Sequence, residues 1–262
     1  MIYRYDNDTL RKIEYAFIIV VDVIKTTNMN TIIKAPLRRR HYLVFDVETT
    51  GLLPKKNISP TIDQYPYILQ LSFAIYDMDA QSIVQKYDSY VNIADTVVID
   101  DFVSNLTGIT KQICLTKGKP ICNVLYDFYK AYNMCQGLVG HNLEFDTKMI
   151  SVEIERNQAQ LIEQGLADCL ILFQPMHEKI NNIDRYCTMK MGTKLCNIEF
   201  PSSNTATGTT GTTLQKPRLK FPKLSELHQT LFDEIPANLH NSMVDVEVCL
   251  RCYLKMRHNI ET

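Results

Sequence analysis

The chain has 262 residues, which is enough for one large domain with a sizeable core. Hydrophobic residues make up 45% of it and charged residues 22%, as is ordinary for a soluble globular protein. The formal net charge of −1 excludes nucleic-acid binding through overall basic charge alone, so any such binding needs local contacts or cations that carry the positive charge.

Residues 1–40 are expected to form an N-terminal appendage. Residues 15–25 are β-like, and the apolar part of this stretch is too short to cross a membrane and contains Asp22. The basic run 37–40 is compatible with a phosphate contact or with a solvated edge. We therefore expect no membrane association.

The next stretch, residues 42–52, carries the first chemical signal. Apolar residues run into Asp46, Val47 and Glu48, followed by a turn signal, so a buried strand is predicted. Side chains alternate along a strand, and Asp46 and Glu48 therefore share one face. Either they end an edge strand in solvent, or a hard divalent cation neutralises them, because buried carboxylate charges are costly.

Two further strands are predicted over residues 67–76 and 82–93, after a polar loop at 54–66. Residues 77–81 form a turn between them. Together with the first strand they indicate an antiparallel meander.

Helical and strand patterns then alternate, which favours an α/β fold. One helix is predicted to begin after Thr110, which could cap it, and two more are predicted over 120–135 and over about 143–164. A short buried strand is expected at 138–141, between the last two helices. A second short strand is expected at 168–173.

The pattern of residues 183–190 is ambiguous between helix and strand. Residues 202–213 are rich in Thr and Gly and predict a flexible inserted loop, taken as about 202–217. Helices are expected over 223–232, ended by Pro236, and over about 242–258.

The eight cysteines are scattered and follow no secretory signal, which favours a reducing, cytoplasmic location. Cys249 and Cys252 lie at the spacing of one helix face. A zinc site there would need a second pair of ligands at a fitting distance, and His258 alone does not supply it.

Two more acidic stretches come at helix starts. In 139–146, Asp146 lies in the first turns of a predicted helix, where it is either a capping residue or a ligand, while His141 and Asn142 can fix the turn. In 239–247, His240 precedes a helix that contains Asp245, and the spacing of Ser242 and Asp245 suits a capping box.

Three segments of this sequence, Phe-Asp-Val-Glu-Thr-Thr-Gly at 45–51, His-Asn-Leu-Glu-Phe-Asp at 141–146 and His-Asn-Ser-Met-Val-Asp at 240–245, together resemble the motifs of the DEDDh family. This DnaQ-like group of 3′→5′ exonucleases includes proofreading subunits of bacterial DNA polymerases and RNA-trimming enzymes. The resemblance spans about residues 41–258. It implies a ribonuclease-H-like fold, a mixed five-stranded sheet flanked by helices, in an exonuclease domain at 41–262.

The resemblance also implies roles for individual residues. Two divalent cations, Mg²⁺ or Mn²⁺, would be held by four carboxylates, those of Asp46, Glu48, Asp146 and Asp245. His240 would act as the general base. The substrate-binding set would comprise Thr49, Thr50, Leu52, Asn142 and Phe145. Two cations about 3.5–4 Å apart can make a nucleophile from water and steady the leaving 3′ oxygen.

The predicted function is therefore metal-dependent hydrolysis of single-stranded 3′ ends, with DNA favoured over RNA and a DNA polymerase as a possible partner. Two alternatives stay open. One is an exoribonuclease that trims RNA, which depends on how the pocket treats a 2′-hydroxyl group. The other is a non-catalytic nucleic-acid-binding module on the same fold, because a fold does not guarantee a function.

Overall fold

The computed structural model describes residues 40–55, 59–200 and 218–261. The expected strand at 15–25, most of the basic run 37–40 and the insertion at 202–217 lie outside these residues. None of the helices in the described part is long and apolar enough to span a lipid bilayer.

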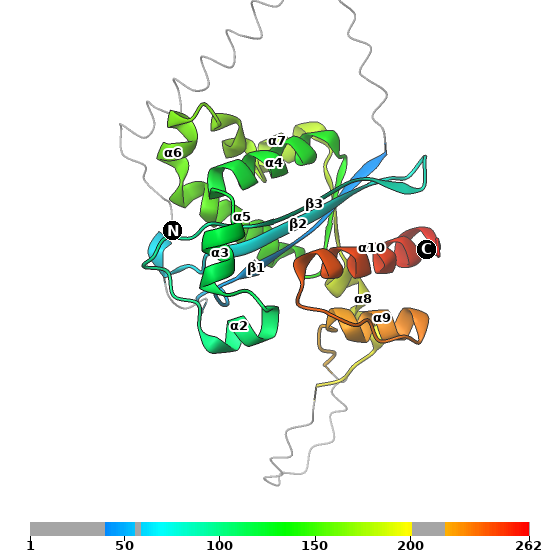
Figure 1. Cartoon of the computed structure of the whole chain (residues 1–262). Helices are drawn as coiled ribbons and strands as arrows, with labels where there is room; N and C mark the ends of the chain where they lie inside the picture. Colours follow the sequence, from blue (N-terminus) through cyan, green and yellow to red (C-terminus); the bar gives the residue numbers. More distant parts are fainter. Residues whose placement is uncertain (1–39, 56–58, 201–217, 262) are drawn as a thin grey trace, which may run out of the picture. The chain divides into compact units, whose positions relative to one another are not determined.

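A five-stranded mixed sheet forms the centre of the fold (Figure 1), with strand order β3-β2-β1-β4-β5. Strands β1 (His41–Thr49), β2 (Ile68–Asp77) and β3 (Ser82–Tyr90) make the predicted antiparallel meander. Strands β4 (Gly137–Gly140) and β5 (Asp184–Cys187) continue the sheet in parallel with β1. The expectation of a mixed five-stranded sheet flanked by helices is confirmed.

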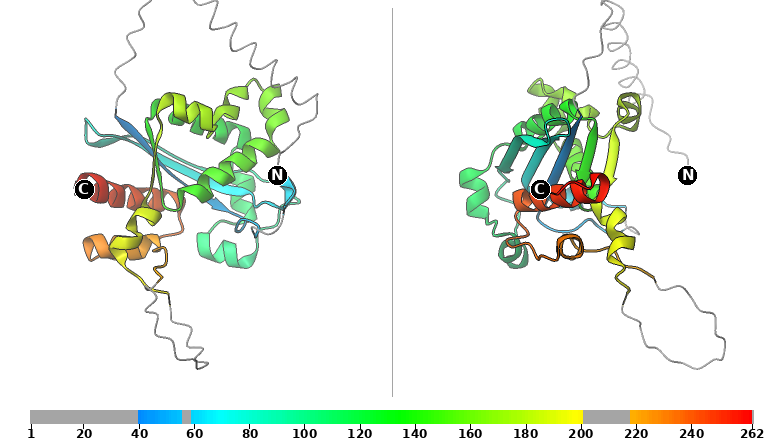
Figure 2. Two further views of the ribbon diagram at one scale, coloured as in Figure 1. Left: turned by 180° about the vertical axis from the view of Figure 1, so that it is seen from behind. Right: turned by 90° about the vertical axis from the view of Figure 1, so that its right-hand side faces the viewer.

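Helices and short 3-10 turns surround the sheet on both faces, as the two views of Figure 2 show. In chain order they are η1 (Ile62–Gln64), α2 (Asp101–Thr107), α3 (Lys111–Lys117), α4 (Ile121–Met134), α5 (Leu143–Arg156), α6 (Gln158–Glu163), η2 (Ala167–Ile171), α7 (Pro175–Asn181), α8 (Thr188–Cys196), α9 (Leu224–Phe232) and α10 (Ser242–His258).

The two faces of β1 belong to two separate apolar clusters. Leu43, Phe45 and Val47 point into the larger cluster, where the ring of Phe45 meets Phe128 of α4 edge-on at 5.0 Å between centroids. Tyr42 and Val44 point to the other face, into a smaller cluster formed largely with α10. Asp46 and Glu48 follow Tyr42 and Val44 at the same spacing of two, so β1 aims its acids at the α10 face.

Some expected boundaries are wrong. The helix expected over 143–164 is two helices, α5 and α6. Between them lies Asn157, which caps the end of α5 and whose side chain donates to the carbonyl oxygen of Glu153 at 2.8 Å. The short strand expected at 168–173 is the 3-10 helix η2. The helix over 223–232 ends before Asp233, which adopts a left-handed conformation at φ 56°, and not at Pro236.

The ambiguous residues 183–190 contain both kinds of structure, β5 and the start of α8. The short helices α2 and α7 were not predicted. Cys249 and Cys252 do lie buried on one helix, α10, and all eight cysteines are unpaired.

Candidate active site

Three carboxylates from two distant parts of the chain meet at the end of β1. Asp46 and Glu48 come from β1 and Asp245 from the first turn of α10, and an oxygen atom of each lies within 4.8 Å of the others. In the described part of the chain this is the only group of His, Cys, Asp or Glu side chains close enough to share a metal ion. The acid sites predicted from the first and third motifs therefore converge.

Asp146 lies next to this trio and comes from a third element, α5. It is in the first turn of α5, is only 2% exposed, and its Oδ1 accepts a hydrogen bond of 3.3 Å from the backbone N–H of Val47. It does not cap its own helix, because the cap residue is Asn142, in a left-handed conformation at φ 74°. The capping alternative for Asp146 is thus replaced by a contact with β1.

The peptide group between Asp46 and Val47 links all three elements of the site. Its carbonyl oxygen accepts a hydrogen bond of 2.8 Å from the hydroxyl group of Ser242 in α10, while its N–H donates a hydrogen bond to Asp146 in α5. The expected capping box of Ser242 and Asp245 is wrong, because Asn241 caps α10 by accepting from the N–H of Val244 at 3.4 Å. Ser242 instead fixes the acid-bearing helix to the acid-bearing strand.

Burial and mutual repulsion make these acids hard to ionise. Burial, then the charges of Asp46 and Asp245, raise the pKa of Glu48 to about 9. Burial, then the charge of Asp245, raise the pKa of Asp46 to about 7. Burial raises the pKa of Asp245 to about 6, and burial together with Asp46 raises that of Asp146 well above its ordinary value.

The donor set fits hard divalent cations. All four residues offer carboxylate oxygen atoms, the ligands that Mg²⁺ and Mn²⁺ prefer. Within the described residues, the Oδ2 of Asp146 and the Oδ1 of Asp245 are buried without a hydrogen-bond partner. Such buried acceptors normally have a partner, and a cation would supply it while relieving the repulsion.

His240 lies in the loop directly before α10. Its backbone is left-handed at φ 69°, and its N–H donates to Oδ2 of Asp245 at 3.1 Å. Its side chain is exposed, and its ring makes no hydrogen bond or ion pair with any residue that the structure describes. The main chain of His240 is thus fixed beside the site while its imidazole group faces solvent.

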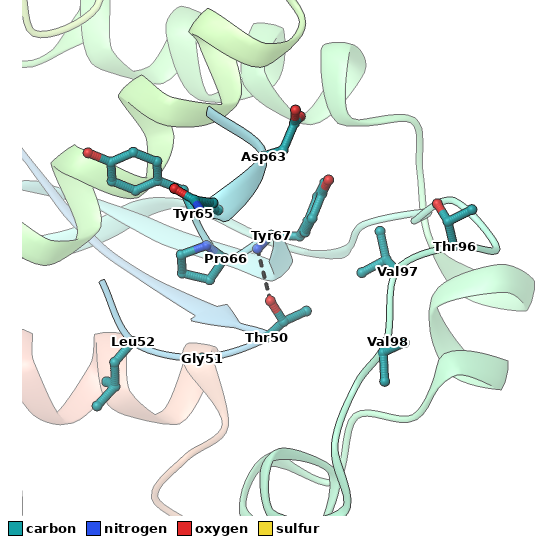
Figure 3. A pocket seen from close by; sticks show the side chains of 11 residues that line it. Thr50, Gly51, Leu52, Asp63, Tyr65, Pro66, Tyr67, Thr96, Val97 and Val98 are labelled. Atoms are coloured by element: carbon teal, nitrogen blue, oxygen red, sulfur yellow. Dashed lines mark hydrogen bonds between the residues drawn. The ribbon is translucent and has the colours of Figure 1, made fainter. Parts of the chain in front are cut away.

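The turn after β1 leads into a cavity of about 510 Å³. Figure 3 shows Thr50 between the segment of Tyr65 and Tyr67 and the segment 96–98, with the N–H of Tyr67 bonded to the hydroxyl of Thr50 at 3.0 Å. Leu52, at 86% exposure, lines the same cavity. Two of the expected substrate-binding residues thus line one cavity, which starts two residues after Glu48 and is lined by none of the four acids.

The other three expected substrate-binding residues are placed differently. The hydroxyl of Thr49 is used within the turn, where it donates to the carbonyl of Gly51 at 2.6 Å. Asn142 and Phe145 lie at the start of α5, outside the residues that line the cavity of Thr50 and Leu52. Their roles toward a substrate stay predictions.

Sequence reasoning missed several residues that build the site. Ser242 has a helix-start pattern that hides its tertiary contact. His141 does not fix its own turn but bonds Thr188 of α8 through Nδ1 and the carbonyl of Pro222 through Nε2, both at 3.0 Å. Tyr65 and Tyr67 stood in or beside a polar loop without a motif, so nothing in the sequence distinguished them.

Comparison with a protein-family model places the chain among nucleases. The family RNase_T, described as exonuclease, matches residues 43–253. DNA polymerase III of the PolC type from Streptococcus agalactiae is 34% identical over 136 residues, which are 51% of this chain and 8% of that protein. The PolC-type enzyme of Lactococcus lactis is 32% identical over 131 residues, 49% of this chain and 7% of that protein. The chain therefore matches only a small part of each of these long relatives.

Solved structures share the fold. Exonuclease I of E. coli in complex with a dT13 oligonucleotide aligns with a TM-score of 0.57 at 16% identity, over 84% of this chain and 42% of that chain. Exonuclease I of Methylocaldum szegediense aligns with a TM-score of 0.52 at 16% identity, over 84% of this chain and 41% of that one. The resemblance to DnaQ-like exonucleases expected from the three motifs is confirmed.

Proposed function

We propose, from the premise that this chain belongs to the exonuclease family RNase_T, that it hydrolyses the terminal phosphodiester bond at 3′ ends of single-stranded nucleic acid, DNA in preference to RNA. The observation that carries this proposal is the convergence of Asp46, Glu48 and Asp245, with Asp146 beside them. Bringing buried carboxylates together costs free energy through desolvation and mutual repulsion, and such clusters are typical of catalytic or cation-binding sites.

Two divalent cations, Mg²⁺ or Mn²⁺, held by these four acids would neutralise their charge, activate a water molecule and stabilise the leaving 3′ oxygen. The raised pKa values of Asp46 and Glu48 mean that cations and protons compete for the same oxygen atoms. Cation binding therefore keeps these side chains ionised near neutral pH.

His240 is the general base in this proposal. Its backbone contact with Asp245 keeps it beside the acids, and its exposed imidazole group has no competing partner among the described side chains. A histidine suits proton transfer near neutral pH because imidazole groups as a class titrate there.

The terminal nucleotide is proposed to lie against Thr50 and Leu52, next to the acids. An exposed leucine at 86% exposure offers an apolar surface for a base, and the cavity behind it has room for a nucleotide. Thr49, Asn142 and Phe145 are proposed to support the same subsite.

The preference for DNA, and association with a DNA polymerase, are supported by the relatives. The matching segments belong to DNA polymerase III of the PolC type, and the E. coli exonuclease I was solved with deoxyoligonucleotides. Both features are part of this proposal.

The test is a gel time course with 5′-labelled single-stranded DNA and RNA of the same sequence, in Mg²⁺, in Mn²⁺ and in EDTA. We expect a ladder that shortens from the 3′ end, faster for DNA, and that disappears with EDTA. Asp46→Asn should be inactive, whereas Asp79→Asn, which removes an exposed hairpin acid, should retain full activity. Binding of both strands without shortening would instead support a non-catalytic module, and faster shortening of RNA would support an exoribonuclease.

A further inference from the structure

A row of polar residues crosses the sheet beside the acids. In the register of β1 and β2, Ser72 lies opposite Asp46 and Gln70 opposite Glu48, and in that of β2 and β3, Asp88 lies opposite Ser72. Directly opposed residues in an antiparallel pair point to the same face, with Cβ atoms about 4.5–5.5 Å apart. The side chains of Ser72 and Gln70 therefore stand immediately next to the two acids of β1.

Asp88 holds both of these side chains. Its Oδ1 accepts a hydrogen bond of 2.8 Å from the hydroxyl group of Ser72 and one of 2.7 Å from the side-chain amide of Gln70. Ser72 and Gln70 are 0% and 1% exposed, so water does not satisfy them, while Asp88 is exposed on the edge strand. Across the described residues, neither side chain donates a hydrogen bond to Asp46 or Glu48.

The direction of these two hydrogen bonds matters for the acids. A serine hydroxyl group can donate only one hydrogen bond, and Ser72 donates it to Asp88. Without Asp88, the carboxylates of Asp46 and Glu48 would be the neighbouring acceptors for the hydroxyl of Ser72 and the amide of Gln70. A hydrogen bond to a charged acceptor is stronger than one between neutral groups, so donors that turned toward the acids would compete with a cation for the same oxygen atoms.

We propose that Asp88 is a positioning residue that keeps Ser72 and Gln70 turned away from Asp46 and Glu48, so that the oxygen atoms of these acids stay open to a divalent cation. This inference rests on the proposed cation binding at the four acids. Asp88 lies two strands away from the acids of β1 and belongs to none of the three motifs.

Two variants separate the hydrogen-bonding role of Asp88 from its charge. Asp88→Asn removes the charge but keeps a side-chain oxygen that accepts from both donors. Asp88→Ala removes the acceptor. A third variant, Gln70→Leu with Ser72→Ala and Asp88→Ala, removes the donors as well and leaves nothing that could turn toward the acids.

The measurement is the Kd for Mn²⁺ by isothermal titration calorimetry on the full chain, with nuclease activity against Mg²⁺ concentration as a second readout. We expect Asp88→Ala to raise the Kd about tenfold, the scale of one hydrogen bond to a charged group. Asp88→Asn and the triple variant should both bind Mn²⁺ within about twofold of the wild type.

The outcomes distinguish this inference from the function on which it rests. If the triple variant binds as weakly as Asp88→Ala, or if Asp88→Asn is equally weak, the turning of the donors is refuted while the cation site stands. If the wild-type chain binds no Mn²⁺, the proposed cation site itself fails, and the role of Asp88 fails with it.

One further variant keeps the proposal testable if Asp88→Ala does not fold. Gln70→Leu with Ser72→Ala, made with Asp88 intact, should leave the Kd for Mn²⁺ unchanged, because the donors do not serve the acids. A tenfold weaker affinity in this double variant would show that Ser72 and Gln70 support the acids directly, and would overturn the proposal.

Discussion

The hydroxyl group of Ser242 donates a hydrogen bond to the carbonyl oxygen of Asp46 across 196 positions of sequence. Ser242 is fully buried, so this bond has no competition from water. It sets where α10 begins relative to β1, and thereby how far the carboxylate of Asp245 lies from that of Asp46. The geometry of the acid site therefore depends on a side chain outside the set of acids.

Ser242→Ala should therefore affect both stability and cation binding. The buried carbonyl of Asp46 loses the bond from this hydroxyl group, which costs about 0.5–1.5 kcal/mol of unfolding free energy. The start of α10 is also freed from β1, so the Kd for Mn²⁺ should rise. Denaturant unfolding and calorimetry measure the two effects.

The matched control for Ser242 is Ser151→Ala. Among the residues that the structure describes, the hydroxyl of Ser151 bonds only the carbonyl of Thr147 in its own helix, α5. Its removal should leave the Kd for Mn²⁺ unchanged. An equal loss of Mn²⁺ affinity in both variants would argue against a specific link between Ser242 and the acids.

The metal-free protein should lose stability as the pH rises. The pKa of Glu48 is about 9 in the folded state, well above that of an ordinary carboxyl group, so between these values the folded state binds more protons than the unfolded state. The free energy of unfolding then falls with increasing pH, by about 1–2 kcal/mol between about pH 7.5 and 9. His141, whose pKa is lowered to about 4, has the opposite sign, but its effect lies at lower pH.

Unfolding in EDTA at several pH values measures this effect, with Glu48→Gln as the comparison. The variant should be more stable than the wild type at pH 9 and should show a flatter profile over the same range. Saturating Mg²⁺ should remove most of the difference. A wild-type stability that does not change from pH 7.5 to 9 in EDTA would contradict the raised pKa of Glu48.

A substitution of His240 tests its role as a base. The left-handed backbone at φ 69° is unfavourable for Ala but accessible to Asn, so His240→Asn keeps the loop while removing the imidazole. The rate constant kcat should fall about 10²–10⁴-fold and lose the rise with pH that a histidine base gives. Unchanged KM together with normal Mn²⁺ binding would locate the loss in the chemical step, whereas a wild-type pH profile in the variant would refute the role.

Leu52 offers a test of substrate binding without a change in the acids. Because its side chain is exposed in the free protein, Leu52→Ala should leave the free energy of unfolding within about 0.5 kcal/mol of the wild type. The variant should raise KM for single-stranded DNA about tenfold, since burying a leucine side chain contributes about 1.5–3 kcal/mol. Ile180→Ala, which removes an exposed residue of α7, should change neither value.

The acid-bearing part of the fold was predictable because it follows short-range rules. The period of two in β1 fixed the common face of Asp46 and Glu48, and the turn signals fixed the meander. The strand prediction for residues 168–173 was wrong because a short apolar run does not distinguish a strand from a helical turn. Tertiary packing favours the 3-10 helix η2 there.

The supporting contacts were not predictable, because they join residues far apart in the chain. Ser242 reads as a helix start, and nothing near it indicates the carbonyl of Asp46. Asp88 stands in an ordinary strand pattern, and only the register of β2 and β3 brings it to Ser72. Such tertiary partners override the local capping and strand preferences that a sequence displays.

The most direct test of the account is whether a metal ion contacts the phosphate that is cleaved. A 5′-labelled DNA strand would carry sulfur in place of one non-bridging oxygen at its last linkage, as each of the two separated diastereomers. Mg²⁺ prefers oxygen ligands and tolerates sulfur poorly, whereas Mn²⁺ accepts it more readily. We predict that cleavage of at least one diastereomer is slow in Mg²⁺ and is restored in Mn²⁺, relative to the unmodified strand. Equal relative rates in the two metals for both diastereomers, with the unmodified strand cleaved normally, would contradict a cation held by these carboxylates at the scissile phosphate.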